Sequence, residues 1–315
     1  MKSLECVRNN LVFIVGCSRS GTTLLKSILN EHYDVFIPPE TFYFSNIAKN
    51  GKKIVEKNKK IEYLLSHWWI RGMINEVNFK DSAKDVINDW DEIYLHLLRS
   101  TSSKKNIKVF GEKTPQHIMV ADQLLENFPG SKIIHVIRDP RAVFYSFSSI
   151  ALGTNQVSSV VDEWKGVMEM HKKLKDSTGY HYVKYENLVS NPSREIESMC
   201  NFIGIKYSEV LLDYYRRSDD GYFPEQTHHE NTLKPIFNSS IDKWREGLKN
   251  RDIAILELYL GELMSENGYN LTGAVTKFAH AKYQFSRIYD LLSKIFLRKP
   301  RQWVKKMKAM NRLKK

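Results

Sequence analysis

The feature that most constrains the fold is a strand, loop and helix pattern near the N-terminus. Residues 11–16 (LVFIVG) form a continuous apolar run, which is typical of a strand buried on both faces. A loop with the spacing G-x-x-x-x-G-T-T follows from Gly16 to Thr23. Apolar residues then recur at helical spacing, at positions 24, 25, 28 and 29. Backbone N–H groups of such a loop, together with the positive end of the following helix, can bind an anion. The pattern therefore predicts an anion site.

Similar short β-rich runs follow at intervals long enough for helical crossovers. We expect strands at 107–110, 132–137 and 181–184, and a short second strand just before Glu40. This alternation predicts an α/β fold with a mainly parallel, doubly wound sheet flanked by helices. Ligands of such sheets bind beyond the carboxyl ends of the strands.

Two segments depart from this rhythm. Residues 50–105 are rich in Lys, Asn and Asp and show helical patterns, so we expect a helical insertion over the acceptor cleft at the ligand edge of the sheet. Residues 271–315 read as a basic, amphipathic helical tail, which leaves 1–270 as the main domain.

The net charge of +12 is confined to that tail. Residues 277–315 carry 13 Lys and Arg against one acid, Asp290, so the remainder is balanced at 35 of each sign. Apolar positions 285, 288, 289, 292, 295 and 296 mark one helical face. The tail therefore fits a helix lying on an anionic membrane, or a helix docked on the body with a solvated charged end. No nucleic-acid partner is expected, because aromatic residues are scarcely interleaved with the cations.

Cysteine usage and hydropathy bear on the compartment. Cys6, Cys17 and Cys200 lie far apart, without the paired spacing of a zinc site or a disulfide framework. The apolar run at 11–16 is too short for a secretory segment or a spanning helix. We expect a cytoplasmic protein, with peripheral membrane attachment as the alternative.

The loop lacks the lysine of nucleotide hydrolases. Thr22 occupies the position at which that lysine would reach the outer phosphates, and Arg19 is the only nearby cation. The loop is thus suited to hold an anion without triphosphate hydrolysis. The alternative interpretation is an ordinary glycine turn with a surface arginine.

Two segments together carry a family resemblance. The run CSRSGTTL from Cys17 resembles the 5′-phosphosulfate loop of sulfotransferases, which use 3′-phosphoadenosine 5′-phosphosulfate (PAPS) as sulfuryl donor. The run KIIHVIRDPRAVFYS ending at Ser146 resembles the site that grips the 3′-phosphate through an arginine, here Arg138, and a serine. The resemblance implies a P-loop nucleotide-kinase-like fold. It also implies that the 5′-phosphosulfate is held by Arg19, Ser20, Gly21, Thr22 and Thr23.

Three weaker matches occur in the expected order, so that the resemblance spans about residues 10–250. Tyr185 lies in a segment similar to the strand end near the nucleotide. Lys234, in NTLKP, resembles part of the late loop that encloses the nucleotide. Lys113, in GEKTP, resembles the lysine delivered to the transferring group. The assignment requires Arg138 to point toward the Arg19 turn, so that one nucleotide can bridge them.

Sulfuryl transfer depends on positioning and on neutralising the charge of the leaving phosphate, a role for Arg19 and Lys113. No metal is expected, since the transferring sulfate carries a single charge. The base for an alcohol acceptor is sought among Glu40, Glu112, His117 and the pair His228-His229. Glu40 is preferred, because it follows the second strand and because its spacing from the loop resembles that in tyrosylprotein sulfotransferases.

The resemblance therefore implies a sulfotransferase acting on a hydroxyl acceptor: a carbohydrate, lipid headgroup, phenol or tyrosyl group. One alternative is an ATP-dependent small-molecule kinase, although the loop lysine is missing and Asp139 is a poor magnesium site. Another is a catalytically silent nucleotide-binding protein associated with membranes. Aromatic residues at 42–44, 68 and 69 either line the acceptor site or belong to the core.

Overall fold

The structure, a computed structural model, describes residues 4–83, 89–102, 107–149, 157–216, 233–274 and 279–296, the last eight by their backbone only. The chain divides into two compact units. The first comprises residues 1–138 and 166–241, and the second residues 139–165 and 242–315. The boundary that we expected at residue 270 is not one of these division points, and that domain assignment stays a prediction.

The first unit is built on a five-stranded parallel sheet with the order β2-β3-β1-β4-β5. Its strands are β1 (Leu11–Gly16), β2 (Val35–Phe36), β3 (Val109–Lys113), β4 (Lys132–Ile137) and β5 (Tyr180–Lys184). The parallel α/β fold that the sequence predicts is confirmed. Strand β3 begins two residues later than expected and continues as far as Lys113, because Phe13 and Ile14 of β1 pair with Glu112 and Lys113.

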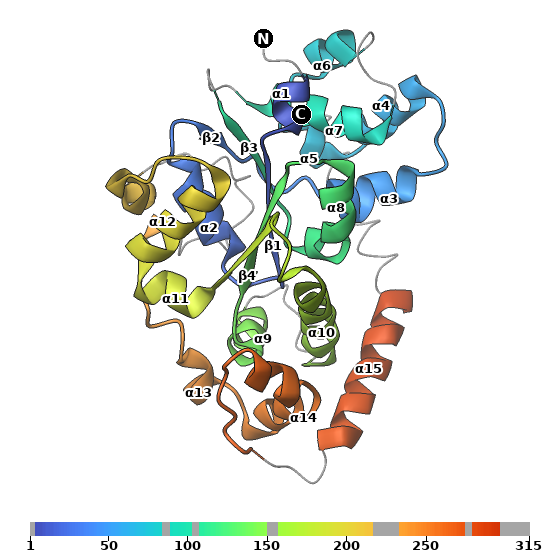
Figure 1. Cartoon of the computed structure of the whole chain (residues 1–315). Coiled ribbons are helices and arrows are strands. Elements are labelled where there is room, and N and C mark those ends of the chain that lie inside the picture. The colour runs from blue at the N-terminus through green and yellow to red at the C-terminus, as the bar shows by residue number, and fades with distance from the viewer. Residues whose placement is uncertain are drawn as a thin grey trace. The chain divides into compact units, whose positions relative to one another are not determined.

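Alternate residues of β1 serve the two faces of the sheet, as the pleat of a strand requires. Val12 and Ile14 join an aliphatic cluster with α2 (Thr22–Asn30), α11 (Tyr185–Ser190) and α12 (Pro192–Ile203). These three helices lie on one side of the sheet (Figure 1). On the other face, Phe13 contacts the rings of Tyr94 and Phe128, beside α7 (Trp90–Thr101) and α8 (Ala121–Asn127). Both faces of β1 are therefore covered, which explains its unbroken apolar sequence.

In its described part, the region expected as a helical insertion consists of helices joined by turns and short loops. It contains α3 (Ala48–Gly51), α4 (Lys57–Leu65), α5 (Trp68–Arg71), α6 (Glu76–Ala83) and α7. The first unit also includes α1 (Leu4–Arg8), a π-helix at Tyr43–Ile47, and 3-10 helices at Pro115–Val120 and Glu209–Arg216. That the insertion covers an acceptor cleft stays a prediction.

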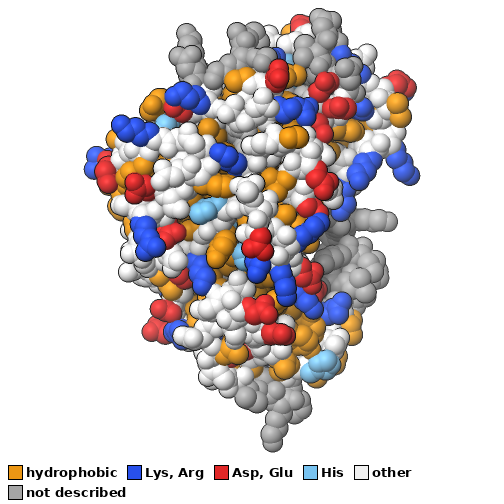
Figure 2. Space-filling model, viewed as in Figure 1, with side chains coloured by type: hydrophobic (Ala, Val, Ile, Leu, Met, Phe, Trp, Pro, Cys, Tyr) orange, Lys and Arg blue, Asp and Glu red, His pale blue; other side chains and the backbone are white. Residues whose placement is uncertain are grey.

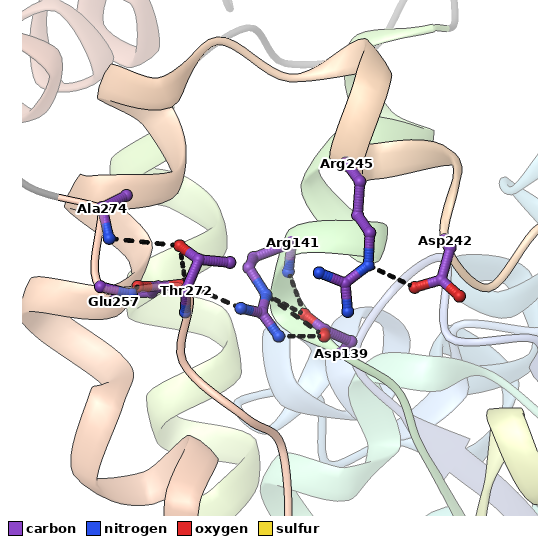
Figure 3. Close-up of polar contacts among 8 residues, drawn as sticks. Asp139, Arg141, Asp242, Arg245, Glu257, Thr272 and Ala274 are labelled. Carbon is purple, nitrogen blue, oxygen red and sulfur yellow. Dashed lines mark hydrogen bonds and ion pairs between the residues drawn. The ribbon is translucent and has the colours of Figure 1, made fainter.

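The second unit contains α9 (Pro140–Ser148), α13 (Lys243–Gly247), α14 (Asn250–Glu266) and α15 (Ala279–Phe296), while α10 (Val157–Leu174) supplies residues to both units. Its centre is a buried ion network, in which the Arg141 guanidinium binds the carboxylates of Asp139 and Glu257 at 2.7 Å each (Figure 3). Glu257 also accepts hydrogen bonds from the backbone of Thr272 and Gly273. The Arg141 side chain lies 4.0 Å above the Trp244 ring. This network joins α9, α13, α14 and the loop after α14.

Helix α15 shows which side of the predicted tail packs on the protein. Tyr283 and Ser286 are buried, and Ser286 shares a hydrogen bond with Ser158 of α10. Phe285 and Ile288, from the predicted apolar face, are 73% and 55% exposed. Elsewhere, Lys and Arg side chains are interspersed with Asp and Glu on the face drawn in Figure 2, as the balanced body charge predicts.

Candidate active site

The five parallel strands all end at one edge of the first unit, and each end leads to a residue predicted for the site. In the order of the sheet, these are Glu40 after β2, Lys113 in β3, the Gly16–Thr23 loop after β1, Arg138 after β4 and Tyr185 after β5. Side chains far apart in the sequence thus gather at the ligand edge because the strands are parallel.

The glycine loop has a conformation that its sequence permits. Gly21, at the N-terminus of α2, has φ 101°, and a β-carbon there would lie 2.4 Å from Cδ2 of Tyr185. Glycine is therefore required at this position on two counts. The Ser20 hydroxyl is fully buried, without a hydrogen-bond partner among the described residues. The orphan N–H groups of the first turn of α2 follow directly, so the loop offers several donors to an anion.

Arg138 points toward the Arg19 turn, as the sequence-based assignment requires. Its Nη1 donates to the backbone carbonyl of Arg19 at 3.0 Å, and its Nη2 donates to the carbonyl of Ser240 at 3.1 Å. Its guanidinium lies 4.1 Å from the centre of the Tyr185 ring. The Tyr185 hydroxyl in turn shares a hydrogen bond of 2.7 Å with Ser240. The ring and two carbonyls thus fix a cation beside the loop.

The two arginines make this place electropositive. Burial lowers the pKa of the Arg19 guanidinium below its ordinary value, and the positive charge of Arg138 lowers it further. The Glu40 carboxylate acts in the opposite direction, but the pKa of Arg19 remains lowered. A bound anion would relieve this repulsion, so the electrostatics favour a negatively charged ligand.

Lys113 connects the loop to Glu40. Its side chain is 2% exposed, and the ammonium group donates to the Thr23 hydroxyl at 3.2 Å and forms an ion pair with Glu40. The Glu40 side chain is 22% exposed, so one of its faces is open to a ligand. This arrangement brings together a cation for a leaving group and a carboxylate able to accept a proton.

Two of the rival bases are more deeply buried than Glu40. Glu112 and His117 are at most 1% exposed. The Glu112 carboxylate accepts from the Thr41 N–H at 3.3 Å, and His117 Nε2 accepts from the Phe44 N–H at 3.2 Å. Buried groups engaged with the backbone are out of reach of an acceptor, so the geometry favours Glu40 as the base. The assignment of the base stays a prediction.

Burial shifts the protonation of these two groups in opposite directions. It raises the pKa of the Glu112 carboxyl to about 7 and lowers the pKa of His117 to about 3. Between pH 4.5 and 7, Glu112 is protonated to a larger fraction in the folded protein than in the unfolded chain. Its contribution to stability therefore falls as the pH rises. Between pH 3 and 6.5, His117 is protonated to a smaller fraction in the folded protein than in the unfolded chain. Its contribution to stability therefore rises with pH. The two contributions offset each other where the intervals overlap.

Glu112→Gln should remove the pH-dependent contribution of Glu112 to stability and leave that of His117. We expect the variant to gain stability over the wild type as the pH rises from 4.5 to 7, by roughly 3 kcal/mol at the upper end. Urea unfolding of both proteins across this interval measures the difference. Parallel stability profiles would show that Glu112 titrates as in the unfolded chain.

Three residues make site contacts that sequence reasoning did not predict. Gln116 donates to the loop residue Ser18 at 3.0 Å, and Trp69 donates to the Thr41 carbonyl at 3.1 Å. Ser240 binds both Arg138 and Tyr185. Gln116 could have been proposed from the sequence, because it lies only three residues after the predicted site residue Lys113. Ser240 had no local signal.

Other predicted residues lie apart from these contacts or outside the description. Lys234 is exposed, and its carbonyl accepts from the Tyr214 hydroxyl at 2.6 Å. Ser146 lies on α9 in the second unit, and its predicted role in phosphate binding stays a prediction. His228, His229 and Asn231 lie outside the described residues.

The aromatic residues left open by the sequence divide between core and surface. Tyr43 is fully buried, whereas Phe42 and Trp69 are partly exposed, with ring centres 6.3 Å apart. Trp68 is 50% exposed.

Two searches cover only the described part of the chain. There, no cluster of three or more His, Cys, Asp or Glu side chains could hold a metal ion. Likewise, none of the described helices has the length and apolar character needed to cross a membrane.

The ligand edge of the parallel sheet thus carries a glycine loop, two arginines and a lysine–carboxylate pair, an arrangement that favours an anionic ligand. Residues 11–209 match the model of the sulfotransferase family, and the chain belongs to that family. This match confirms the family resemblance identified from the sequence and the class of enzyme that it implies, a sulfotransferase.

The similar proteins agree with this membership. A putative protein-tyrosine sulfotransferase of Caenorhabditis briggsae is 24% identical over 65% of this chain and 69% of its own length. A protein-tyrosine sulfotransferase of Drosophila melanogaster is 23% identical over 74% of this chain, which spans only 46% of that relative. The sulfotransferase domain of the Synechococcus PCC 7002 olefin synthase has a similar fold, with a TM-score of 0.61 and 22% identity. That likeness covers 83% of this chain and 95% of the domain.

Proposed function

We propose that this protein transfers a sulfuryl group from PAPS to a hydroxyl group of its acceptor and releases adenosine 3′,5′-bisphosphate. The observation that carries the proposal is the joint placement of Arg138 against the Arg19 loop and of the Glu40–Lys113 pair beside Thr23. The first pair suits a nucleotide with two anionic ends, and the second suits the transfer itself. An ATP-dependent kinase has no such support, because Thr22 replaces the loop lysine.

The proposed roles follow from these contacts. The loop residues Arg19, Ser20, Gly21, Thr22 and Thr23 would hold the 5′-phosphosulfate, with the Ser20 hydroxyl and the N–H groups of the helix start as donors.

The 3′-phosphate end of the nucleotide would be bound by residues that follow the neighbouring strands. Arg138, braced by the Tyr185 ring, would bind the 3′-phosphate. The exposed side chain of Lys234 is assigned, from the family resemblance alone, to enclosing the nucleotide.

The chain's own side chains can accept the proton and neutralise the charge that the transfer step releases. The acceptor oxygen attacks sulfur while Glu40 takes the acceptor's proton. The bond between sulfur and the bridging oxygen of the 5′-phosphate breaks, and the charge left on that oxygen is neutralised by Lys113 and Arg19. We assign the acceptor to the side of Glu40 where Phe42 and Trp69 are partly exposed.

Calorimetric titration with adenosine 3′,5′-bisphosphate, 5′-AMP and ATP tests the donor site. We expect the bisphosphate to bind at least about tenfold more tightly than 5′-AMP, because each charge-assisted hydrogen bond to the 3′-phosphate contributes roughly 1.5–3 kcal/mol. Arg138→Gln should abolish this preference and change the affinity for 5′-AMP less than about threefold.

A matched control is Lys173→Gln, which removes an exposed cation paired with Asp122 in the same unit. This variant should keep the preference, because its charge is exposed and screened by solvent. Equal affinities of the wild type for the bisphosphate and 5′-AMP would refute the proposed donor.

A second proposal concerns the tail: α15 attaches the protein to anionic membrane surfaces. It is favoured by the exposure of Phe285 and Ile288 on a helix whose opposite side is packed, within a segment rich in cations. Phe285→Ser with Ile288→Ser should weaken sedimentation with phosphatidylserine vesicles at least about tenfold. Leu258→Ser, at another exposed apolar position of the same unit, is the control. Equal sedimentation of all three proteins would exclude this attachment.

A further inference from the structure

The segment from Glu112 to His117 binds the chain around Glu40 through a row of side chains. Glu112 Oε1 accepts from the N–H of Thr41 at 3.3 Å. The Thr114 hydroxyl accepts from the N–H of Phe42 at 3.3 Å, and His117 Nε2 accepts from the N–H of Phe44 at 3.2 Å. Three of the four backbone N–H groups at residues 41–44 are therefore satisfied by one short segment.

The row is buried and internally connected. Glu112, Thr114 and His117 are at most 1% exposed. The Thr114 hydroxyl also donates its own proton to Glu112 Oε1, so it both gives and accepts a hydrogen bond. Because the Phe44 N–H occupies Nε2 of neutral His117, the ring proton lies on Nδ1, which is 3.9 Å from Glu112 Oε1. Loss of the Thr114 hydroxyl would therefore remove a hydrogen-bond partner from both the Phe42 N–H and Glu112.

The chain that these side chains hold is not in a locally preferred conformation. Phe42 has φ 52°, in the left-handed region that residues other than glycine seldom adopt. The surrounding contacts must therefore impose this turn, which begins two residues after Glu40. The indole of Trp69 adds a fourth contact, to the carbonyl of Thr41.

The same segment also reaches the glycine loop. Lys113 binds Thr23 and Glu40, and Gln116 binds Ser18. Side chains of one segment thus fix both the anion loop and the turn after Glu40. One short segment therefore contacts both the loop and the turn, and links their positions.

We propose that Thr114, acting with Glu112 and His117, is a positioning residue that holds the Glu40 carboxylate against Lys113 and the loop. This inference rests on the proposed function for its catalytic consequence, whereas the positioning itself is a property of the fold. Thr114 does not touch the reacting atoms in this scheme. Its removal would misplace Glu40, and a misplacement of about 1 Å can cost 10²-fold in rate.

The test compares Thr114→Val, which keeps the shape and loses the hydroxyl, with Thr114→Ser, which keeps the hydroxyl. With PAPS and the best acceptor from a panel, we expect kcat to fall about 10- to 100-fold in the valine variant. Binding of adenosine 3′,5′-bisphosphate should change less than about threefold, and the serine variant should keep kcat within about threefold. In a Glu40→Gln background, Thr114→Val should cost less than about threefold more, since both changes disable the same group.

A second readout needs no turnover. Lys113 is 1% exposed and paired with Glu40, so its acetylation by acetic anhydride should be slow. We expect Thr114→Val and Glu40→Gln to accelerate acetylation of Lys113 at least about threefold, and Thr114→Ser to leave it unchanged. Exposed Lys173 is the internal control in the same digest.

The outcomes separate the two claims. Unchanged Lys113 reactivity in Thr114→Val, or an equal loss of kcat with and without Glu40, overturns the positioning role while PAPS-dependent transfer stands. Faster Lys113 acetylation in a protein without preference for the bisphosphate supports the positioning role and overturns the donor assignment.

Discussion

Glu40→Gln should lower kcat by about 10²- to 10⁴-fold at saturating PAPS, because the variant keeps the size of the side chain and loses its ability to take a proton. The partly exposed Glu40 carboxylate lies against Lys113 at the strand edge, whereas Glu112 and His117 are buried. Turnover is measured as release of adenosine 3′,5′-bisphosphate. The acceptors are a phenol, a tyrosyl peptide, a hydroxylated lipid and an oligosaccharide.

The matched control is Glu56→Gln, which changes an exposed carboxylate paired with Lys59 at the start of α4. It should leave kcat within about twofold of the wild type, because exposed ion pairs contribute little. Affinity of Glu40→Gln for the bisphosphate should be equal or higher, since Lys113 loses its carboxylate partner. A fall in kcat of less than about tenfold would remove Glu40 as the base.

Arg141→Met should destabilise the protein by about 3–5 kcal/mol, the cost typical of removing one partner from a buried ion network. Arg141 is 2% exposed and binds Asp139 and Glu257, so its loss leaves two buried carboxylates without their cation. The free energy of unfolding in urea measures the change. Arg245→Met is the control, because Arg245 also lies over Trp244 but its ion pair with Asp242 is exposed. We expect it to cost less than about 1 kcal/mol.

The pH dependence of this variant provides a second check. Burial by itself would raise the pKa of Glu257, but hydrogen bonds from Thr272 and Arg141 hold it below its ordinary value of 4.5. In the wild type, this stabilisation is present above pH 4.5 and is lost as the pH falls through the lowered pKa. The cost of Arg141→Met should therefore shrink below about pH 4.5, where the carboxylates take up protons. A cost independent of pH would assign the effect to packing around Trp244 instead.

Much of the fold was predictable because its signals are local. The apolar run at 11–16, the glycine spacing that follows and the helical repeat after it could form only a strand, a loop and a helix. The same reasoning applied to 132–137, where a buried strand ends next to Arg138. Alternation of strands and helices then implied a parallel sheet, and with it one shared edge for the site.

The candidate residues were identified mainly through the resemblance of short motifs to the sulfotransferase family, but their partners were not predicted. That Glu40 pairs with Lys113, and that Arg138 lies on Tyr185 with Ser240 behind it, depends on strand order and loop closure across up to 102 residues. No periodicity or spacing encodes such a pairing. Likewise, the sequence predicted an apolar face on the last helix, yet Phe285 and Ile288 of that face are exposed.

The sequence by itself determined the class of fold, the family and the position of the glycine loop, because each depends on residues close together in the chain. Only the tertiary structure decided that Glu112 is buried beneath the turn after Glu40 and that Thr114 joins the two. Adjacent side chains of an extended strand point to opposite sides, so Lys113 reaches the loop while its neighbour Glu112 faces the interior. Both side chains are buried, and the groups that each one contacts are a property of the whole fold.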